Sequence, residues 1–247
     1  MPANDFYDDL APFYHMICRD WEKSVVDQAA ALDAIIKENW GAGVKDILDV
    51  SCGIGTQALG LSALGYNLTA SDPSAGAIAR AKSETEKRGL KIDFSVADMR
   101  DARDCDFDLV ISCDNSVPHL LTDDDILTAF RRFYSCVRPG GGVLISVRDY
   151  DREIKTGTVV KPYDPHEEDG AKYTIFQIWN FEGDIYDMSL YIAEDAGDIE
   201  CDTRVFKTKY YAIGTDKLIS LMSQAGFSGV MRIDNKYFQP VIIGKKT

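Results

Sequence analysis

The sequence predicts an α/β protein: a mostly parallel, doubly wound sheet with helices on both faces, and an antiparallel β insertion before the last helix and two strands. Three observations predict this fold. Within residues 45–150, short apolar runs alternate with helical segments of about 10 to 15 residues, the pattern of a parallel sheet with crossover helices. From 151 to 212, apolar and polar residues alternate instead. One helical segment and two further apolar runs complete the chain.

The first half of the chain supplies the helices and parallel strands. Residues 6–40 are expected to be helical, because apolar side chains between Val25 and Ile36 recur at three- and four-residue spacing. The expected elements after that helix are a strand at 46–50, a helix from about Thr56, a strand at 66–72, a helix at 74–90 closed by Gly89, and strands at 91–98, 107–114 and 141–149.

The second half begins with the insertion. Residues 172–181, 184–195 and 203–213 alternate apolar with polar side chains and are separated by Gly- and Asp-rich turns, as in an antiparallel sheet. A helix follows at 215–227, with Thr215 as its N-cap and Gly226 as its stop, and strands follow at 229–235 and 239–245. The expected division is a helical cap (1–44), a core (45–150), the β-rich insertion (151–212) and a closing part of the core (213–247).

Composition excludes several classes of function. The formal net charge of -13 opposes binding to nucleic acid or to an anionic membrane. The six cysteines form no Cys-x-x-Cys pair and the three histidines are far apart, so the sequence predicts no metal site. No leader peptide or membrane-spanning run is found, which predicts a cytoplasmic protein that acts on a small molecule.

The stretch KDILDVSCGIGTQALG at 45–60 carries the first chemical signal. Gly53-x-Gly55-x-x-Ala58 fits the loose dinucleotide fingerprint, which is weak evidence alone. Asp49 lies in the strand just before the turn, where its charge would repel a pyrophosphate. An acid beside a glycine turn therefore favours a cationic ligand.

Four segments together resemble the class I S-adenosylmethionine-dependent methyltransferases: LDVSCGIGTQ, TASDPS, VADMRD and RPGGG. The resemblance implies a Rossmann-like, seven-stranded sheet and S-adenosylmethionine as cofactor. It implies that Asp72 accepts both ribose hydroxyls and that Asp98, with Met99, meets the adenine. The remaining residues expected at the cofactor are Asp49, Ser51, Cys52, Gly53, Gly55, Cys113, His119, Tyr14 and Lys23.

Within that family, CDNSVPHLL, SVRDYD and KTKYY look like the glycine N-methyltransferases. The likeness implies that Asn115 and Arg148 hold an amino-acid substrate and that tyrosines close the pocket. Tyr191 and Tyr210 are the candidates by position, with Tyr7 and Tyr14 as further ones, and His119 is a candidate to assist loss of the amine proton. The family has a basic residue on the N-terminal helix for the cofactor carboxylate, and here only Lys23, with Arg19 before it, is available.

Structural readings of the same residues stay open at this point. Asp72 can cap a helix that starts near Ser74, Asn115 and His119 can be structural, and Arg148 can pair with Asp149 or Asp151.

The sequence predicts N-methylation of a small amine that bears a carboxylate, such as glycine or sarcosine, with S-adenosylhomocysteine as the other product. In-line attack by a neutral amine on the activated methyl group needs orientation and no covalent nucleophile. The alternatives are an O- or N-methyltransferase of another small-molecule class and a regulatory protein that binds the cofactor without turnover.

Overall fold

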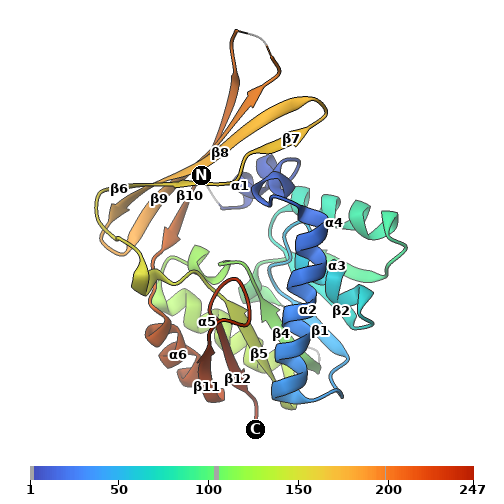
Figure 1. The fold of residues 1–247 in the computed structure, drawn as a ribbon. Helices are drawn as coiled ribbons and strands as arrows, with labels where there is room; N and C mark the ends of the chain where they lie inside the picture. The colour runs from blue at the N-terminus through green and yellow to red at the C-terminus, as the bar shows by residue number, and fades with distance from the viewer. Residues whose placement is uncertain (1–2, 103–105, 198) are drawn as a thin grey trace.

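A computed structural model describes residues 3–102, 106–197 and 199–247, which form two sheets and the helices around them (Figure 1). The larger sheet has seven strands in the order β11-β12-β5-β4-β1-β2-β3. Neighbours among β1 to β5 are parallel, and β12 runs antiparallel to both β5 and β11. The strands of this sheet are β1 (Asp46–Asp49), β2 (Asn67–Asp72), β3 (Ile92–Val96), β4 (Phe107–Ser112), β5 (Val137–Ser146), β11 (Ser228–Ile233) and β12 (Val241–Lys245). The predicted seven-stranded, doubly wound sheet is confirmed.

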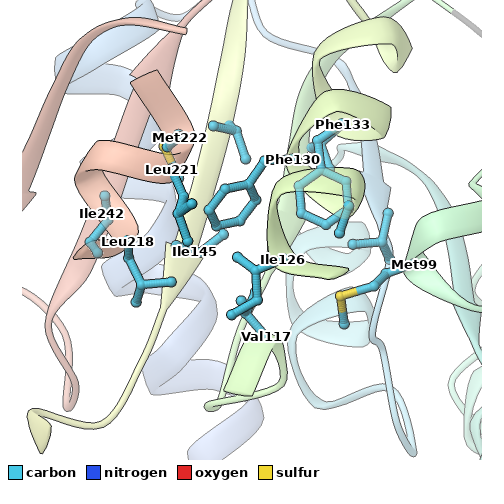
Figure 2. Packing of buried hydrophobic residues seen from close by; sticks show 14 of the residues in the cluster. Met99, Val117, Ile126, Phe130, Phe133, Ile145, Leu218, Leu221, Met222 and Ile242 are labelled. Carbon is cyan, nitrogen blue, oxygen red and sulfur yellow. The ribbon is translucent and has the colours of Figure 1, made fainter. Parts of the chain in front are cut away.

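Each face of the larger sheet is covered by its own set of helices. On one face lie α2 (Trp21–Trp40), α3 (Thr56–Ala63) and α4 (Ala75–Lys87), and on the other α5 (Asp123–Cys136) and α6 (Thr215–Gln224). Alternate strand residues therefore enter different cores. Leu144 packs in the core with α2 and α3, whereas its neighbours Val143 and Ile145 pack in the core with α5 and α6. Figure 2 shows Phe130 of α5 and Leu221 of α6 meeting over Ile145.

The N-terminal region, expected to be helical over 6–40, is helical but divided into three pieces. It consists of α1 (Ala3–Leu10), the 3-10 helix η1 (Tyr14–Ile17) and α2. Pro12 lacks the backbone N–H that a continuing helix needs. Asp20 then starts α2, because its side chain accepts a hydrogen bond from the backbone N–H of Lys23.

The helix α2 packs unusually close to α3 at Gly60. A Cβ atom at Gly60 would lie 2.4 Å from the backbone oxygen of Val25 and 2.5 Å from Cβ of Ala29. Only glycine fits between the two backbones, so this contact holds α3 and the turn before it against α2.

The smaller sheet is antiparallel and lies above the carboxyl ends of the parallel strands (Figure 1). Its order is β10-β9-β8-β6, and β7 also pairs with β8. Its strands are β6 (Thr158–Pro162), β7 (His166–Glu168), β8 (Ala171–Glu182), β9 (Ile185–Asp195) and β10 (Asp202–Tyr211). Phe6 and Leu10 of α1 pack in the core of this sheet, so the N-terminal segment lies between it and the larger sheet.

Two boundaries differ from the sequence prediction. Gly214, not Thr215, is the N-cap of α6, and the carboxylate of Asp151 accepts hydrogen bonds from both the N–H and the hydroxyl of Thr215. The Arg-Pro-Gly-Gly-Gly segment is not a turn before β5 but part of it. The register between β4 and β5 shifts there, since Phe107 pairs with Val137 whereas Leu109 pairs with Gly142.

Three short 3-10 helices complete the described structure: η2 (Met99–Asp101), η3 (Val117–His119) and η4 (Tyr150–Arg152). The division into a cap, a core, an insertion and a closing part stays a prediction. In the described ranges, no helix combines the length and the apolar character needed to cross a membrane.

Candidate active site

The glycine turn after β1 has the backbone conformation that its sequence demands. Gly53 and Gly55 have φ angles of 54° and 98°, in the left-handed region that favours glycine. Gly55 is the N-cap of α3, and the N–H of Cys52 donates to the backbone oxygen of Ser71 at the end of β2. The turn is therefore fixed between the ends of two adjacent strands.

A cavity of about 370 Å³ opens at the carboxyl ends of the parallel strands, beside this turn. We call it the outer cavity. Nine of the residues that the sequence assigned to the cofactor line it: Tyr14, Ser51, Cys52, Gly53, Asp72, Asp98, Met99, Cys113 and His119. The carboxyl-end position is where ligands bind in wound α/β sheets.

Asp72 lies at the end of β2 and is almost fully buried. One carboxylate oxygen accepts the N–H of Gly53 at 2.9 Å, and the other accepts the N–H of Ser74 at 2.9 Å. Burial raises its pKa to about 6, although these two hydrogen bonds act in the opposite direction. Asp72 thus supports the start of α4, whose N-cap is Ser74, and also faces the outer cavity.

Asp49 lies directly behind the turn and is 1% exposed. Its Oδ1 accepts the N–H of Ser51, but its Oδ2 has no hydrogen-bond partner among the described residues. Burial, together with the charge of Asp72, raises its pKa to about 7. Two buried carboxylates beside one cavity disfavour each other's ionisation, and a cationic ligand would relieve that cost.

Asp98 sits between β3 and η2 at the opposite side of the outer cavity. Burial raises its pKa, but the guanidinium of Arg100, which contacts both of its oxygens at 2.9 and 3.0 Å, more than offsets burial and leaves the pKa below the usual value. Met99 is buried next to it.

A second, smaller chamber of about 40 Å³ adjoins the outer cavity. We call it the inner chamber. Tyr7, Tyr14 and Asp114 line both spaces, so they mark the junction. The other residues around the inner chamber are Phe6, Leu10, Ile17, Asn115, Arg148, Tyr163, Gln177, Met188, Leu190 and Tyr210. Its lining therefore joins the N-terminal segment, the ends of β4 and β5, and the antiparallel sheet.

Arg148 follows β5 and reaches into the antiparallel sheet. Its guanidinium lies 4.6 Å from the ring centroid of Trp179 and donates to the hydroxyl of Tyr186 at 3.2 Å. Within the described part of the chain, no carboxylate lies at ion-pair distance from it; Asp149 pairs with Arg232 and Arg152 instead. The alternative of an ion pair to Asp149 or Asp151 is therefore not what the fold forms.

Asn115 is buried and connects three segments. It has a φ of 64°, its Oδ1 accepts the backbone N–H of Arg148 at 3.0 Å, and its Nδ2 donates to the hydroxyl of Tyr150 at 2.8 Å. The amide thus fixes the backbone at Arg148 and also faces the inner chamber.

Tyr7, His119 and Tyr210 form a cluster where the two spaces meet. The Tyr7 hydroxyl lies 2.8 Å from Nε2 of His119 and 3.2 Å from the Tyr210 hydroxyl. Burial lowers the pKa of His119 to about 4, so the imidazole is neutral near pH 7. The ring is therefore a hydrogen-bond partner of Tyr7 and carries no charge into the site.

Four predicted site residues do not line either space: Asp49 and Gly55, which lie at the glycine turn, and Tyr191 and Lys23, which lie elsewhere. On β9, Tyr186, Met188 and Leu190 face the buried side of the sheet. Side chains alternate along a strand, so Tyr191 lies on the other face, where its ring stacks on that of Phe176 with the ring centroids 4.8 Å apart. The Lys23 side chain is exposed on α2 and pairs with Asp27 one turn along the helix. Neither lines the outer cavity or the inner chamber.

Sequence reasoning missed several residues of the inner chamber. Asp114 follows the predicted Cys113, is partly buried with a φ of 55°, and accepts a hydrogen bond from the Tyr14 hydroxyl at 3.0 Å; desolvation raises its pKa. The strand-end position of Asp114 was a usable signal. Gln177 comes from β8, where only the facing of the strand identifies it, and Tyr163 comes from the segment directly after β6.

The residues present fit a cofactor with positive charge and hydroxyl groups. The unpartnered Oδ2 of Asp49 and the cavity-facing carboxylate of Asp72 supply negative charge beside the glycine turn. Arg100 is the cationic residue among those lining the outer cavity, and Asp98 already neutralises it. This donor set suits a cationic nucleoside better than a pyrophosphate.

Residues 47–141 match the model of a methyltransferase domain. The glycine/sarcosine N-methyltransferase of Parasynechococcus marenigrum (strain WH8102) is 29% identical over 145 residues, which are 58% of this chain and 50% of that enzyme. The aligned part of the chain thus spans about half the length of this curated relative.

Solved structures agree on the fold. DesVI of Streptomyces venezuelae has a TM-score of 0.81 at 18% identity, with 100% of this chain and 99% of that chain covered. An S-adenosylmethionine-dependent methyltransferase of Clostridium acetobutylicum ATCC 824 has a TM-score of 0.77 at 17% identity, with 99% and 98% covered. Residues 47–141 therefore match a methyltransferase domain, the fold is that of solved S-adenosylmethionine-dependent methyltransferases, and the chain resembles the glycine N-methyltransferases.

Proposed function

We propose that this protein transfers the methyl group of S-adenosylmethionine to the amine of a small acceptor that bears a carboxylate, with glycine and sarcosine as the favoured substrates. The observation that carries this proposal is the partly buried guanidinium of Arg148, which faces the inner chamber without a carboxylate partner among the described residues. A planar fork in such a place binds a carboxylate through two hydrogen bonds.

Asp114 supports the choice of an amino acid. The charged residues that line the inner chamber are Asp114 and Arg148, one acid and one base. An amino acid presents the complementary pair, a carboxylate and an amine. Arg148 would hold the carboxylate, and Asp114, at the junction with the outer cavity, would accept an N–H of the amine and direct the nitrogen toward the cofactor.

The size of the inner chamber supports a small acceptor. A volume of about 40 Å³ for water-sized groups corresponds to roughly three water molecules, since one molecule needs about 10–15 Å³ on this measure. Glycine and sarcosine are of that scale, whereas a sugar ring or a phenol needs more room or a different arrangement of the tyrosines.

The cofactor residues are assigned on the same basis. Asp72 would accept the ribose hydroxyls, Asp98 and Met99 would lie at the adenine, and the turn from Ser51 to Gly53 would contact the methionine part. Asp49 would act through its charge, because it lies behind the turn and not in the cavity lining. Lys23 pairs with Asp27 and is not among the residues that line the outer cavity, so we assign no partner to the cofactor carboxylate.

The chain contributes orientation and electrostatics. The sulfonium of the cofactor supplies an activated methyl group. Positioning the acceptor nitrogen in line with it, inside a chamber closed by Tyr7, Tyr14 and Tyr210, provides the acceleration without a covalent nucleophile. The tyrosine hydroxyls and Asp114 stabilise the nitrogen as positive charge develops on it. Neutral His119 fixes Tyr7 by accepting or donating one hydrogen bond.

The alternatives are methylation of an acceptor of another small-molecule class and cofactor binding without turnover. The net charge of -13 disfavours nucleic acid as an acceptor, and we keep the cytoplasm as the proposed location.

The decisive experiment measures methyl transfer by mass spectrometry with labelled S-adenosylmethionine over a panel of small acceptors. The panel contains glycine, sarcosine, methylamine, an aminosugar and a phenol. We expect methylation of glycine or sarcosine and far slower methylation of methylamine, which lacks the carboxylate. Preference for methylamine or the phenol would contradict the proposal, and tight cofactor binding with no methylated product would favour the regulatory alternative.

A further inference from the structure

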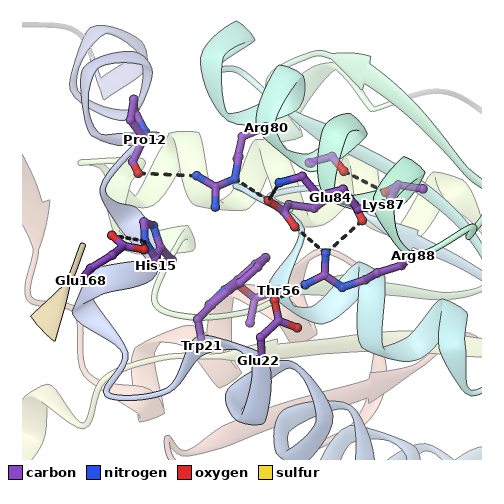
Figure 3. Close-up of polar contacts among 12 residues, drawn as sticks. Pro12, His15, Trp21, Glu22, Thr56, Arg80, Glu84, Lys87, Arg88 and Glu168 are labelled. Carbon is purple, nitrogen blue, oxygen red and sulfur yellow. Dashed lines mark hydrogen bonds and ion pairs between the residues drawn. The ribbon is translucent and has the colours of Figure 1, made fainter. Parts of the chain in front are cut away.

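Three metal-ligating side chains meet on the outside of the molecule, away from both cavities. His15 comes from η1, and His166 and Glu168 come from β7, about 150 residues later in the chain. One ligand atom from each of the three lies within 4.8 Å of the other two, and all three residues are partly buried. Figure 3 shows His15 and Glu168 facing each other.

We propose that His15, His166 and Glu168 bind a divalent transition-metal ion of the zinc class. Two imidazoles and one carboxylate are a ligand set that Zn²⁺ takes in proteins, with a water molecule in the fourth position. The sequence predicted no metal site because the histidines are far apart in the chain. The fold places two of the three histidines with their ring centroids 5.9 Å apart.

The distances suit one shared ion. Two ligands on a tetrahedral zinc ion lie roughly 3.3 Å apart when each is about 2.0–2.1 Å from the metal. Nε2 of His15 lies 3.2 Å from each carboxylate oxygen of Glu168. The third ligand, from His166, needs only a small adjustment from its position within 4.8 Å.

The backbone presents the ligands on one side. His166 and Glu168 are two residues apart on a strand and share a face, whereas Glu167 between them is exposed on the other face. Pairing of β7 with β8, through His166 to Tyr173 and Glu168 to Ala171, holds that face in place. Nε2 of His15 is the atom that faces Glu168, and its Nδ1 is buried without a hydrogen-bond partner among the described residues.

Four basic residues line the same surface cleft as the three candidate ligands: Arg19, Arg80, Lys87 and Arg88. Three of the four are paired with acids. Figure 3 shows an adjacent network in which Glu84 pairs with Arg80, Lys87 and Arg88, and Arg88 also pairs with Glu22. These basic groups are therefore occupied by other acids. Glu168 itself faces His15, with Nε2 of the ring 3.2 Å from its carboxylate.

A bound ion would connect η1 to the antiparallel sheet. Tyr14, next to His15 in η1, lines the outer cavity and the inner chamber. The metal ion would thus hold the N-terminal segment in the position in which that segment closes both spaces, while the ion itself contacts neither space.

The test is a zinc titration of the full chain against a chromophoric chelator, repeated with Co²⁺ to read the ligand type from its absorption spectrum. We expect one ion per chain. Glu168→Gln keeps the shape of the side chain and loses the charged ligand, and His15→Ala removes a nitrogen ligand. Each should weaken binding by at least about tenfold, because even loss of a group behind a metal ligand costs about 10–100-fold. Glu167→Gln removes the same charge one residue away and should bind as the wild type does.

A second measurement covers the case in which His15→Ala does not fold. Zinc should raise the melting temperature of the wild type and of Glu167→Gln, because an ion that binds only the folded state stabilises it, and it should not raise that of Glu168→Gln. Equal affinity in wild type and Glu168→Gln, or a Co²⁺ spectrum with a thiolate charge-transfer band, would overturn the proposal, the latter by pointing to cysteine ligands.

Discussion

The outer cavity and the inner chamber are neighbours, yet they are built in different ways. The outer cavity is lined mainly by residues that directly follow parallel strands, such as Cys52 after β1 and Asp72 at the end of β2. The inner chamber takes its lining from the N-terminal segment, two strand ends and the antiparallel sheet. The first space is thus a property of the sheet itself, and the second exists only when distant segments pack together.

Under the proposed function, this difference separates cofactor binding from acceptor binding. Substitutions in the outer cavity should change the affinity for S-adenosylmethionine, and substitutions in the inner chamber should change turnover at nearly constant cofactor affinity. Each prediction below tests that separation.

The largest expected effect is at Arg148. Arg148→Lys keeps the charge and loses the fork, so the carboxylate of the acceptor is held in the wrong direction for in-line attack. We expect kcat/KM for glycine or sarcosine to fall by a factor that corresponds to about 2–4 kcal/mol of lost transition-state stabilisation, the scale of a truncated charge pair in a desolvated site. Steady-state kinetics with calorimetry of cofactor binding checks it. Methylamine serves as the control acceptor, and a Lys variant that methylates glycine at the wild-type rate would exclude the carboxylate role.

The next effect is at Asp72. Asp72→Asn keeps an oxygen for one backbone N–H and removes the charge that would bind the ribose hydroxyls. We expect S-adenosylmethionine affinity to fall by about 1.5–3 kcal/mol, the range for hydrogen bonds to charged groups. Calorimetry on the folded variant measures it. Lys23→Ala is the matched control, because its side chain lies outside both spaces and the affinity should stay at the wild-type value. The same affinity in the Asn variant would remove Asp72 from the cofactor site.

A pH effect should appear in cofactor binding. Burial raises the pKa of Asp49 to about 7 and that of Asp72 to about 6 in the free protein. A cationic cofactor favours the ionised carboxylates, so below these pKa values binding must release protons. Affinity should therefore be constant above about pH 8 and fall as the pH decreases, with Kd rising roughly tenfold by pH 6.

Asp49→Asn is the control for this pH effect, since it should bind more weakly and lose most of the pH dependence. A wild-type Kd that stays constant from pH 8 to pH 6 would contradict the proposed charge interaction.

The smallest effect distinguishes two tyrosines. Tyr210→Phe removes the hydroxyl that lies 3.2 Å from the Tyr7 hydroxyl at the inner chamber, and we expect kcat/KM to fall by about 1 kcal/mol. Tyr191→Phe changes a residue on the opposite face of the antiparallel sheet and should stay within about 0.5 kcal/mol of the wild type. Steady-state kinetics of both variants tests which face of the antiparallel sheet lies toward the acceptor. Equal losses would place Tyr191 in the acceptor site after all.

The sequence by itself determined the parallel sheet, the glycine turn and the positions of Asp72 and Asp98 at strand ends. These follow from short-range rules: hydrophobic periodicity, the need for glycine at positive φ, and the rule that carboxyl ends of parallel strands share one edge. The expectation that Arg148 holds the substrate rested on two things: its position after a strand end and the family resemblance.

Only the tertiary structure decided which tyrosines face the inner chamber, where Lys23 lies and which histidines meet. A shift of one residue moves a strand side chain to the other face, so alternation alone could not separate Tyr191 from Tyr186. Lys23 lies on the exposed side of α2 and outside the cavity, whereas Val25 and Ala29 of the same helix face α3 at Gly60. His15 and His166 become neighbours because η1 packs beside β7, a contact between segments about 150 residues apart that no local pattern in the sequence specifies.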